Sequence, residues 1–176
     1  MSMESDQLRA LQGPLKERYR QDPGTALVTL RAEARLDAPG VSCRVDTGRA
    51  IVEAGLHPAT GGTGLQACSG DMLLEALAAC AGVTLRAVAT ALDIPIRGGS
   101  VTTEGDLDFR GTLGVAKDVP VGFGTIRLRF NLVSDASREQ IDTLVRLTER
   151  YCVVLQTLRT APTVSVTARI GPPTSP

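Results

Sequence analysis

Four cysteines, Cys43, Cys68, Cys80 and Cys152, are the residues of this chain most suited to covalent chemistry. A peroxide oxidises a cysteine thiolate to a sulfenic acid, and a second thiol can then condense with that acid to form a disulfide. Cys80 and Cys152 each fall on the apolar stripe of a predicted helix, so one core could hold both. The pattern alone leaves two interpretations open, a reactive pair or two inert buried thiols.

The other two cysteines and the single histidine do not indicate a second site. Cys43 shares a predicted strand face with Val41 and Val45, which favours core packing. Cys68 precedes a helix, where it could form mixed disulfides or be a bystander. His57 precedes a proline in a loop, and the chain has none of the close C-x-x-C or H-x-x-x-H spacings of zinc sites. We therefore expect no metal and no cofactor.

The composition argues against several classes of protein. With 43% hydrophobic and 22% charged residues, the 176-residue chain fits one globular domain. Basic and acidic residues number 19 each, which leaves no basic field for nucleic acid or for an anionic membrane. Glu75 and Arg86 interrupt the longest apolar stretch, so we expect no membrane span. The amino terminus lacks the features of a secretory signal, so we expect a cytoplasmic protein with reduced thiols.

The first third of the chain predicts a helix and then a small antiparallel meander. Residues 4–21 have the pattern of a short amphipathic helix within an amino-terminal extension that spans 1–24. Alternating apolar residues predict strands over 25–36 and 41–45 and around 51–52. The short connections between these strands favour antiparallel pairing.

The densest apolar stretch, GDMLLEALAACAGVTLRAVATALD, predicts a long helix over 70–93 with Ser69 as its N-cap. Asp71 in the first turn suits the helix dipole. Apolar residues surround nearly the whole circumference, so we expect the helix to be buried on most sides. Cys80 lies near its middle.

Two more strands, a second helix and a last strand complete the pattern. Ser137 and Gln140 have capping-box spacing at the start of the second helix, which carries Cys152 on its apolar stripe. An exposed, glycine-rich loop joins the two strands. The predicted bounds, in chain order, are 100–109, 125–133, 137–158 and 163–170. This order of elements predicts a mixed α+β fold for residues 25–170, with helices packed on sheet and a short tail over 171–176.

Two segments of the chain resemble the paired signature of the OsmC/Ohr family of thiol-dependent hydroperoxide-reducing proteins. They are SGDMLLEALAAC and, about seventy residues later, ERYCVVLQTLR followed by the strand TVSVTARI. The resemblance covers roughly residues 25–170, and the predicted order of elements also matches that family. It implies an OsmC-like fold, with two buried helices packed on antiparallel sheet, and an intertwined homodimer whose active sites are built partly from the partner chain.

The resemblance also implies roles for individual residues. Cys80 falls at the position of the peroxidatic thiol and Cys152 at that of the resolving thiol, with an external dithiol as reductant. An arginine on an early strand is implied as the cation beside the thiolate; Arg35 is the first candidate and Arg44 the second. Each arginine could equally be a solvated charge on a strand face. Cys80 lies too far into its helix for the helix dipole to help, so we expect its activation to depend on this arginine.

The chain departs from the family pattern at two places. Gly70 and Asp71 stand where family members carry a glutamate, and Asp71 is on the opposite side of an ideal helix from Cys80. Val153 and Val154 replace the proline or polar residues that often follow the second cysteine.

We expect a dimeric thiol peroxidase that reduces organic hydroperoxides in oxidative-stress defence. Two alternatives use the same fold. The redox pair could instead exchange small thiols and disulfides, or the protein could bind an apolar ligand without turnover.

Overall fold

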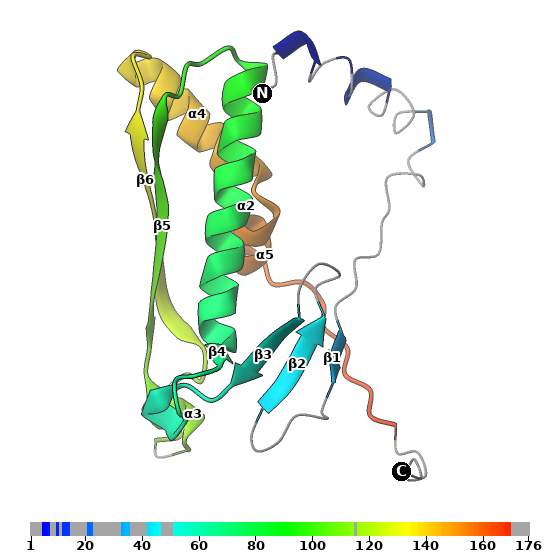
Figure 1. The fold of residues 1–176 in the computed structure, drawn as a ribbon, viewed down its shortest axis with the longest axis vertical. Coiled ribbons are helices and arrows are strands. Elements are labelled where there is room, and N and C mark those ends of the chain that lie inside the picture. The colour runs from blue at the N-terminus through cyan, green and yellow to red at the C-terminus, as the bar shows by residue number, and fades with distance from the viewer. Residues whose placement is uncertain are drawn as a thin grey trace.

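The computed structural model describes residues 5–7, 10, 12–14, 21–22, 33–35, 42–46, 51–114 and 116–169. Its main elements, in chain order, are β1 (Glu33–Arg35), β2 (Ser42–Asp46), β3 (Ile51–Gly55), β4 (Ala67–Cys68), α2 (Ser69–Ala91), β5 (Gly98–Leu107), α3 (Phe109–Thr112), β6 (Phe123–Val133), α4 (Arg138–Tyr151) and α5 (Val153–Arg159). Figure 1 shows α2 as a long central helix, with the hairpin of β5 and β6 along one side. Both α4 and α5 also pack against α2. The fold is α+β, as the order of elements predicted.

Among the described residues, one sheet has four strands, in the order β1-β2-β3-β4. The pairs β1–β2 and β2–β3 are antiparallel, which confirms the predicted meander, and β4 runs parallel to β3. Only residues 33–35 of the predicted strand 25–36 fall in the described part of the chain. The described residues of the predicted amino-terminal helix, 5–7, 10, 12–14 and 21, are helical.

Helix α2 begins one residue earlier than predicted. Its N-cap is Cys68, which ends β4 and makes no side-chain capping bond, so Ser69 is already helical. Asp71 lies in the first turn, as predicted. The helix ends at Ala91, the positive φ of 54° at Asp93 turns the chain, and the Ile94 N–H donates to the Ala89 carbonyl.

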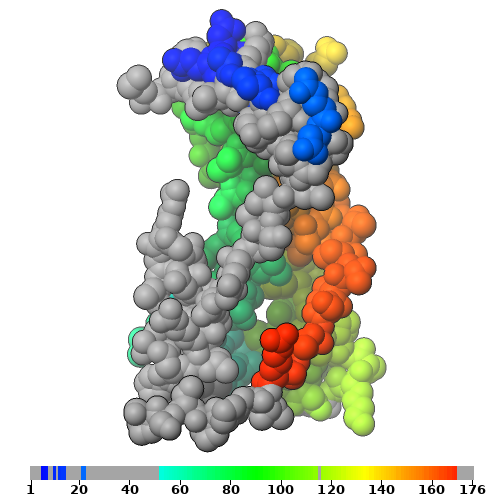
Figure 2. Space-filling view, turned by 90° about the vertical axis from the view of Figure 1, so that its right-hand side faces the viewer, coloured from blue at the N-terminus to red at the C-terminus, as the bar shows by residue number. Residues whose placement is uncertain are grey.

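One stripe of α2 is buried, and the prediction of burial on most sides is wrong for the described part of the chain. The buried residues, Leu77, Ala81, Leu85 and Ala89, recur every four positions and form a single face. Val83, on another face, is 72% exposed. Figure 2 shows part of α2, in green, exposed on this side of the molecule, and the orange segment that contains α5 lies beside it. The helix is apolar nearly all round, as the pattern predicted, but the described elements of one chain bury only one of its faces.

Among the described residues, α2 is the helix long and apolar enough to cross a bilayer by length and composition alone. That is weak evidence, because core helices of soluble proteins pass the same test. Its buried stripe packs on β5, α4 and α5, as a core helix would.

Strands β5 and β6 form a long antiparallel hairpin, within two residues of the predicted bounds. Its inner face packs against α2, where the Thr103 hydroxyl donates to the Leu74 carbonyl over 2.9 Å. The outer face carries a charge network in which Arg127 pairs with Glu104 and Asp106. The connection between the strands was predicted as a loop, but it contains α3, whose first turn is capped by the Asp108 side chain.

Helix α4 begins with the predicted capping box of Ser137 and Gln140. The prediction that it continues to Leu158 is wrong, because the chain leaves helical geometry at Cys152, with φ −71° and ψ 107°, and restarts as α5. The β-branched pair Val153-Val154 that follows has low helix propensity. The break places Cys152 at the end of one helix and at the start of the next.

The predicted last strand, 163–170, is absent from the described residues up to 169. This segment is exposed, with Val164 76% and Val166 92% accessible. Its alternating sequence is typical of a strand, but a strand forms only where another strand satisfies its backbone groups. The single chain offers it no such neighbour within the described part.

The buried core lies between α2 and the elements packed on it, in two clusters. One joins Leu85 and Ala89 of α2 to Ile94 and Leu144. The other joins Leu77 and Ala81 to Cys152, with Cys80 at its edge. The second cluster therefore contains both cysteines on which the sequence analysis concentrated.

Candidate active site

Cys80 and Cys152 lie together in the core, although 71 residues separate them in the sequence. Cys80 is half-buried on α2, and Cys152 is fully buried at the junction of α4 and α5. Both are free thiols. The helix positions of the two residues bring a partly accessible sulfur next to an inaccessible one.

The break at Cys152 frees backbone donors beside Cys80. The Cys152 N–H still donates to the Thr148 carbonyl over 2.9 Å and completes α4, while the Cys152 carbonyl accepts from the Gln156 N–H over 2.9 Å. The first N–H groups of a helix have no acceptor within the helix. Those of Val153 and Val154 donate hydrogen bonds to the Cys80 sulfur. The start of α5 thus supplies a small set of donors for a thiolate.

These donors change the acidity of Cys80. Burial raises the pKa of its thiol, but hydrogen bonds from the Val154 N–H, the Cys152 thiol, the Thr84 hydroxyl and the Val153 N–H together outweigh it, so the pKa is lowered. A Cys80 thiolate is therefore favoured at a lower pH than a free thiol would require.

Cys152 shifts in the opposite direction. Burial is the largest cause that raises the pKa of its thiol, and the hydrogen bond to Cys80 and the negative charge there raise it further. The N–H groups of Leu155 and Val154 lower it, but by less. Of the two neighbouring sulfurs, Cys80 loses its proton first and Cys152 keeps its own.

The described groups that lower the pKa of Cys80 are ones that the sequence analysis did not name. The lowered pKa has the expected direction, but the described causes are donors from α5, Cys152 and Thr84. The sequence analysis considered only the start of the helix that carries Cys80, and not the second helix start that the break at Cys152 creates. Arg35 and Arg44 face each other as register partners on β1 and β2. Their side chains lie outside the described residues, so their role stays a prediction.

Thr84 is the contributor that sequence reasoning missed and could have found. It lies four residues after Cys80 on α2, and residues at that spacing are neighbours on one helix face. A hydroxyl at that position can donate to the cysteine sulfur. The backbone donors of α5 carry no comparable signal, because they depend on a helix break.

The remaining sequence candidates do not join this site. Asp71 is exposed at the start of α2, and Cys68 lines a separate cavity of about 410 Å³ with His57 and Asp71. His57 accepts from the Ala59 N–H through Nδ1 and stacks on Phe109 at 4.8 Å. The Cys43 side chain lies outside the described residues. In the part of the chain that the structure describes, no group of His, Cys, Asp or Glu residues is arranged to hold a metal ion.

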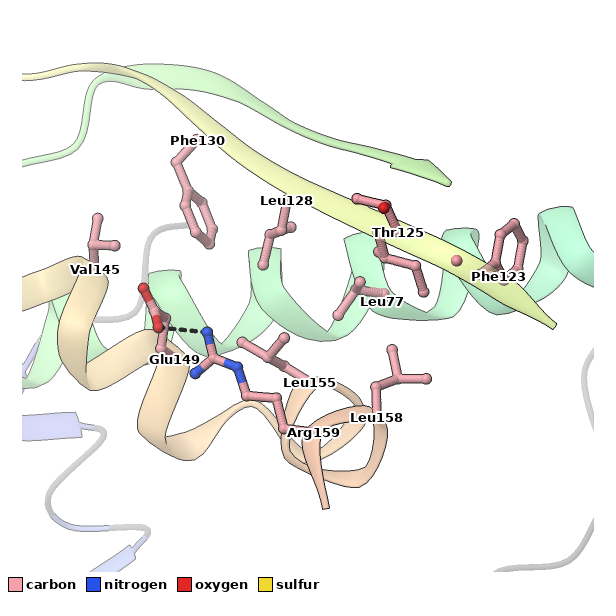
Figure 3. Close-up of a pocket in the computed structure, with 12 residues that line it drawn as sticks. Leu77, Phe123, Thr125, Leu128, Phe130, Val145, Glu149, Leu155, Leu158 and Arg159 are labelled. Carbon is pink, nitrogen blue, oxygen red and sulfur yellow. Dashed lines mark hydrogen bonds and ion pairs between the residues drawn. The ribbon is translucent and has the colours of Figure 1, made fainter. Parts of the chain in front are cut away.

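A second cavity of about 420 Å³ adjoins the cysteine cluster, between β6, α2 and the α4–α5 junction (Figure 3). Most of its lining residues are apolar, although polar atoms make up as much of its surface, and Leu77 and Leu155 belong both to this lining and to the cysteine cluster. Glu149 and Arg159 also line it and form an ion pair of 2.9 Å. The arrangement combines a polarised thiol pair with an adjacent apolar space.

The model of the OsmC-like protein family matches residues 62–167. The chain belongs to this family. The matched range contains α2, the hairpin, α4 and α5, and so includes both cysteines and the two segments that resemble the OsmC/Ohr signature. No sequence among the curated proteins matches the chain.

Solved structures agree with this assignment at the level of the fold. An OsmC-like protein from Mycoplasma pneumoniae is 20% identical, with a TM-score of 0.63, and the match covers 76% of this chain and 89% of that one. An organic hydroperoxide resistance protein from Elizabethkingia anophelis is 20% identical, with a TM-score of 0.60 and coverage of 77% and 91%. One described as an organic hydroperoxide resistance protein OsmC, from Legionella pneumophila, is 20% identical, with a TM-score of 0.59 and coverage of 76% and 91%. The OsmC-like fold is therefore established.

Proposed function

We propose that this protein is a thiol peroxidase that reduces organic hydroperoxides, with Cys80 as the peroxidatic thiol and Cys152 as the resolving thiol. The observation that supports this most strongly is the opposite shift of the two neighbouring pKa values, lowered at Cys80 and raised at Cys152. Two structural neighbours are described as organic hydroperoxide resistance proteins, which favours the same substrate class.

The chemistry balances over three steps. The Cys80 thiolate attacks one oxygen of the hydroperoxide, the O–O bond breaks, and the alcohol leaves after it takes up a proton, so that Cys80 becomes a sulfenic acid. Cys152 then attacks the Cys80 sulfur, loses its proton and releases water, which forms the disulfide. An external dithiol supplies two electrons and two protons, and restores both thiols. Cys152 keeps its proton until Cys80 is oxidised, which suits the order of these steps.

We propose that the working form is a homodimer. The exposed face of α2 and the unpaired strand-like segment around Val164 and Val166 both leave apolar groups uncovered in a single chain. A second copy would cover them and could contribute to each active site. Arg35, or else Arg44, is proposed to supply a guanidinium near the Cys80 thiolate in that assembly. The proposed location is the cytoplasm, where a dithiol reductant is present.

Consumption of cumene hydroperoxide with a dithiol reductant tests the proposal. We expect steady turnover by the native protein and none by Cys80→Ser. Cys152→Ser should still consume about one equivalent of peroxide and form a sulfenic acid that a dimedone probe traps. Equal residual activity in the two variants would contradict the assigned roles.

The apolar cavity beside the cysteines favours one alternative, a protein that binds an apolar ligand. Tight retention of a fatty acid or aromatic probe, without peroxide turnover, would support it. Exchange of small disulfides without peroxide turnover would support a general thiol exchange role instead. Peroxide turnover, ligand retention and disulfide exchange, measured together, therefore separate the three functions.

A further inference from the structure

Helix α5 carries the backbone donors for Cys80, and apolar packing holds only part of it: Val154 and Leu155 pack at the edge of the cysteine cluster. It has only seven residues, all of them described, and none of these is buried. Two of its side chains, Leu155 and Leu158, line the cavity of about 420 Å³, so this side of α5 faces open space (Figure 3). A helix this short is not stable alone. Side-chain hydrogen bonds add to this packing in holding the first turn of α5 beside Cys80.

Two side-chain bonds cross the break at Cys152, and both end on Glu149 of α4. The Gln156 Nε2 donates to the Glu149 main-chain carbonyl over 2.7 Å. The Arg159 Nη2 donates to the Glu149 Oε2 over 2.9 Å, the bond drawn in Figure 3. Gln156 and Arg159 are three residues apart, so they lie on the same face of α5. Together these bonds set the angle at which α5 leaves α4.

We propose that Glu149, Gln156 and Arg159 are positioning residues, a clamp that holds the first turn of α5 against Cys80. The clamp deepens the proposed function, since it assumes that Cys80 is the reactive thiol. None of the three residues touches the reacting sulfur in the described contacts of Cys80; they act through the Val153 and Val154 N–H groups.

Other charged groups do not account for the environment of Cys80. Cys152 is the titratable side chain that contributes to its pKa within the described part of the chain. On β5, Glu104 pairs with Arg129 over 2.8 Å, on the hairpin face opposite the Thr103 that bonds α2. On α2 itself, Glu75 and Arg86 are exposed.

Single and double substitutions distinguish a clamp from a direct effect of charge. If Glu149 and Arg159 acted through space, Glu149→Gln would lower the pKa of Cys80 and Arg159→Gln would raise it. If they act by holding α5, both substitutions release the same helix, and both raise the pKa of Cys80. Gln156→Ala changes no charge and should raise it as well. The double variant Glu149→Gln/Arg159→Gln should raise the pKa of Cys80 by no more than the larger of the two single substitutions does.

The measurement is the pH dependence of Cys80 alkylation by iodoacetamide, followed at the Cys80 peptide by mass spectrometry. We expect each clamp variant to raise the apparent pKa by roughly half a unit, an about threefold loss of thiolate below the pKa. Arg159→Lys should recover part of the loss. Asp142→Asn is the matched control, because it removes the 2.8 Å Arg138–Asp142 pair, which lies within α4 and does not cross the break. It should leave the profile unchanged.

Opposite shifts for Glu149→Gln and Arg159→Gln, or unchanged profiles in all clamp variants, would overturn the clamp. Circular dichroism checks that each variant folds. If Glu149→Gln does not fold, Arg159→Lys and Gln156→Ala serve as milder variants. Alkylation needs no peroxide. A shifted alkylation profile in a protein that fails to reduce cumene hydroperoxide would refute the proposed function and leave the clamp standing. Peroxide turnover with unshifted profiles would support the proposed function and refute the clamp.

Discussion

Replacing Thr84 with valine removes the hydroxyl that donates to the Cys80 sulfur and leaves a side chain of nearly the same size. The hydroxyl is one of four donors that lower the pKa of Cys80 against the effect of burial. Without it, burial is opposed by fewer hydrogen bonds, and the pKa must rise. Because the donor is a neighbour on the same helix, the substitution leaves the break at Cys152 and the start of α5 in place.

The size of the shift follows from the energy of one hydrogen bond. A bond to a charged group contributes about 1.5–3 kcal/mol, and one pKa unit corresponds to about 1.4 kcal/mol. Cys80 is only half-buried and water can replace part of the lost bond, so we take the lower end of this range. We therefore expect the pKa of Cys80 to rise by about one unit.

The assay is the rate of Cys80 alkylation and of peroxide consumption as a function of pH. In the native protein both rates should rise with pH through the lowered pKa of Cys80 and then level off. In Thr84→Val the same curve should move to higher pH, with about tenfold less activity below the native pKa and recovery above it. Thr90→Val, also half-buried on α2, is the control and should not move the curve. Superimposable curves for Thr84→Val and the native protein would refute this account of how the thiolate is stabilised.

Three further predictions concern assembly and stability. Val166→Asp, at a position 92% exposed in one chain, should convert the proposed dimer to monomers by light scattering; an unchanged mass would contradict the proposed interface. Gly105→Ala should cost about 1–3 kcal/mol of unfolding free energy in urea, because a Cβ there would lie 2.6 Å from an aromatic ring of β6, whereas Gly98→Ala meets nothing within 4 Å and serves as its control. The Arg127 guanidinium holds the pKa of the Asp106 carboxyl below its usual range, so the ion pair stabilises the fold above the unfolded pKa and this stabilisation is lost as pH falls through the lowered pKa. Arg127→Gln should therefore lower the Tm near neutral pH and lose this effect as the carboxyl becomes protonated at acid pH; an equal effect at both would count against the ion pair.

The central helix and the hairpin could be predicted because their signals are local. The alanine- and leucine-rich run of α2 and the alternation in β6 each specify one structure, and their bounds were predicted within a few residues. The capping box at Ser137 is likewise encoded in neighbouring residues. These elements position Cys80 and bring α4 against α2.

Apart from Thr84, the groups that lower the pKa of Cys80 could not be predicted, because their position depends on tertiary structure. The apolar stripe of the second helix continues through Cys152 to Leu155, so the pattern gave no sign of the break there. The alternation of TVSVTARI predicted a strand, but a strand needs a neighbouring strand, and the described part of one chain provides none. The strand pattern does not separate Arg35 from Arg44, because the two are register partners on neighbouring antiparallel strands.

Peptide mapping after one equivalent of cumene hydroperoxide, without reductant, tests the central claim most directly. If Cys80 is the low-pKa nucleophile and Cys152 its neighbouring resolving thiol, the oxidised protein should contain a Cys80–Cys152 disulfide, formed faster as pH rises through the pKa of Cys80. The Cys68 and Cys43 peptides should remain free. Consumption of the peroxide with Cys80 and Cys152 both still reduced, or a disulfide that joins Cys80 to Cys68 instead, would contradict the account.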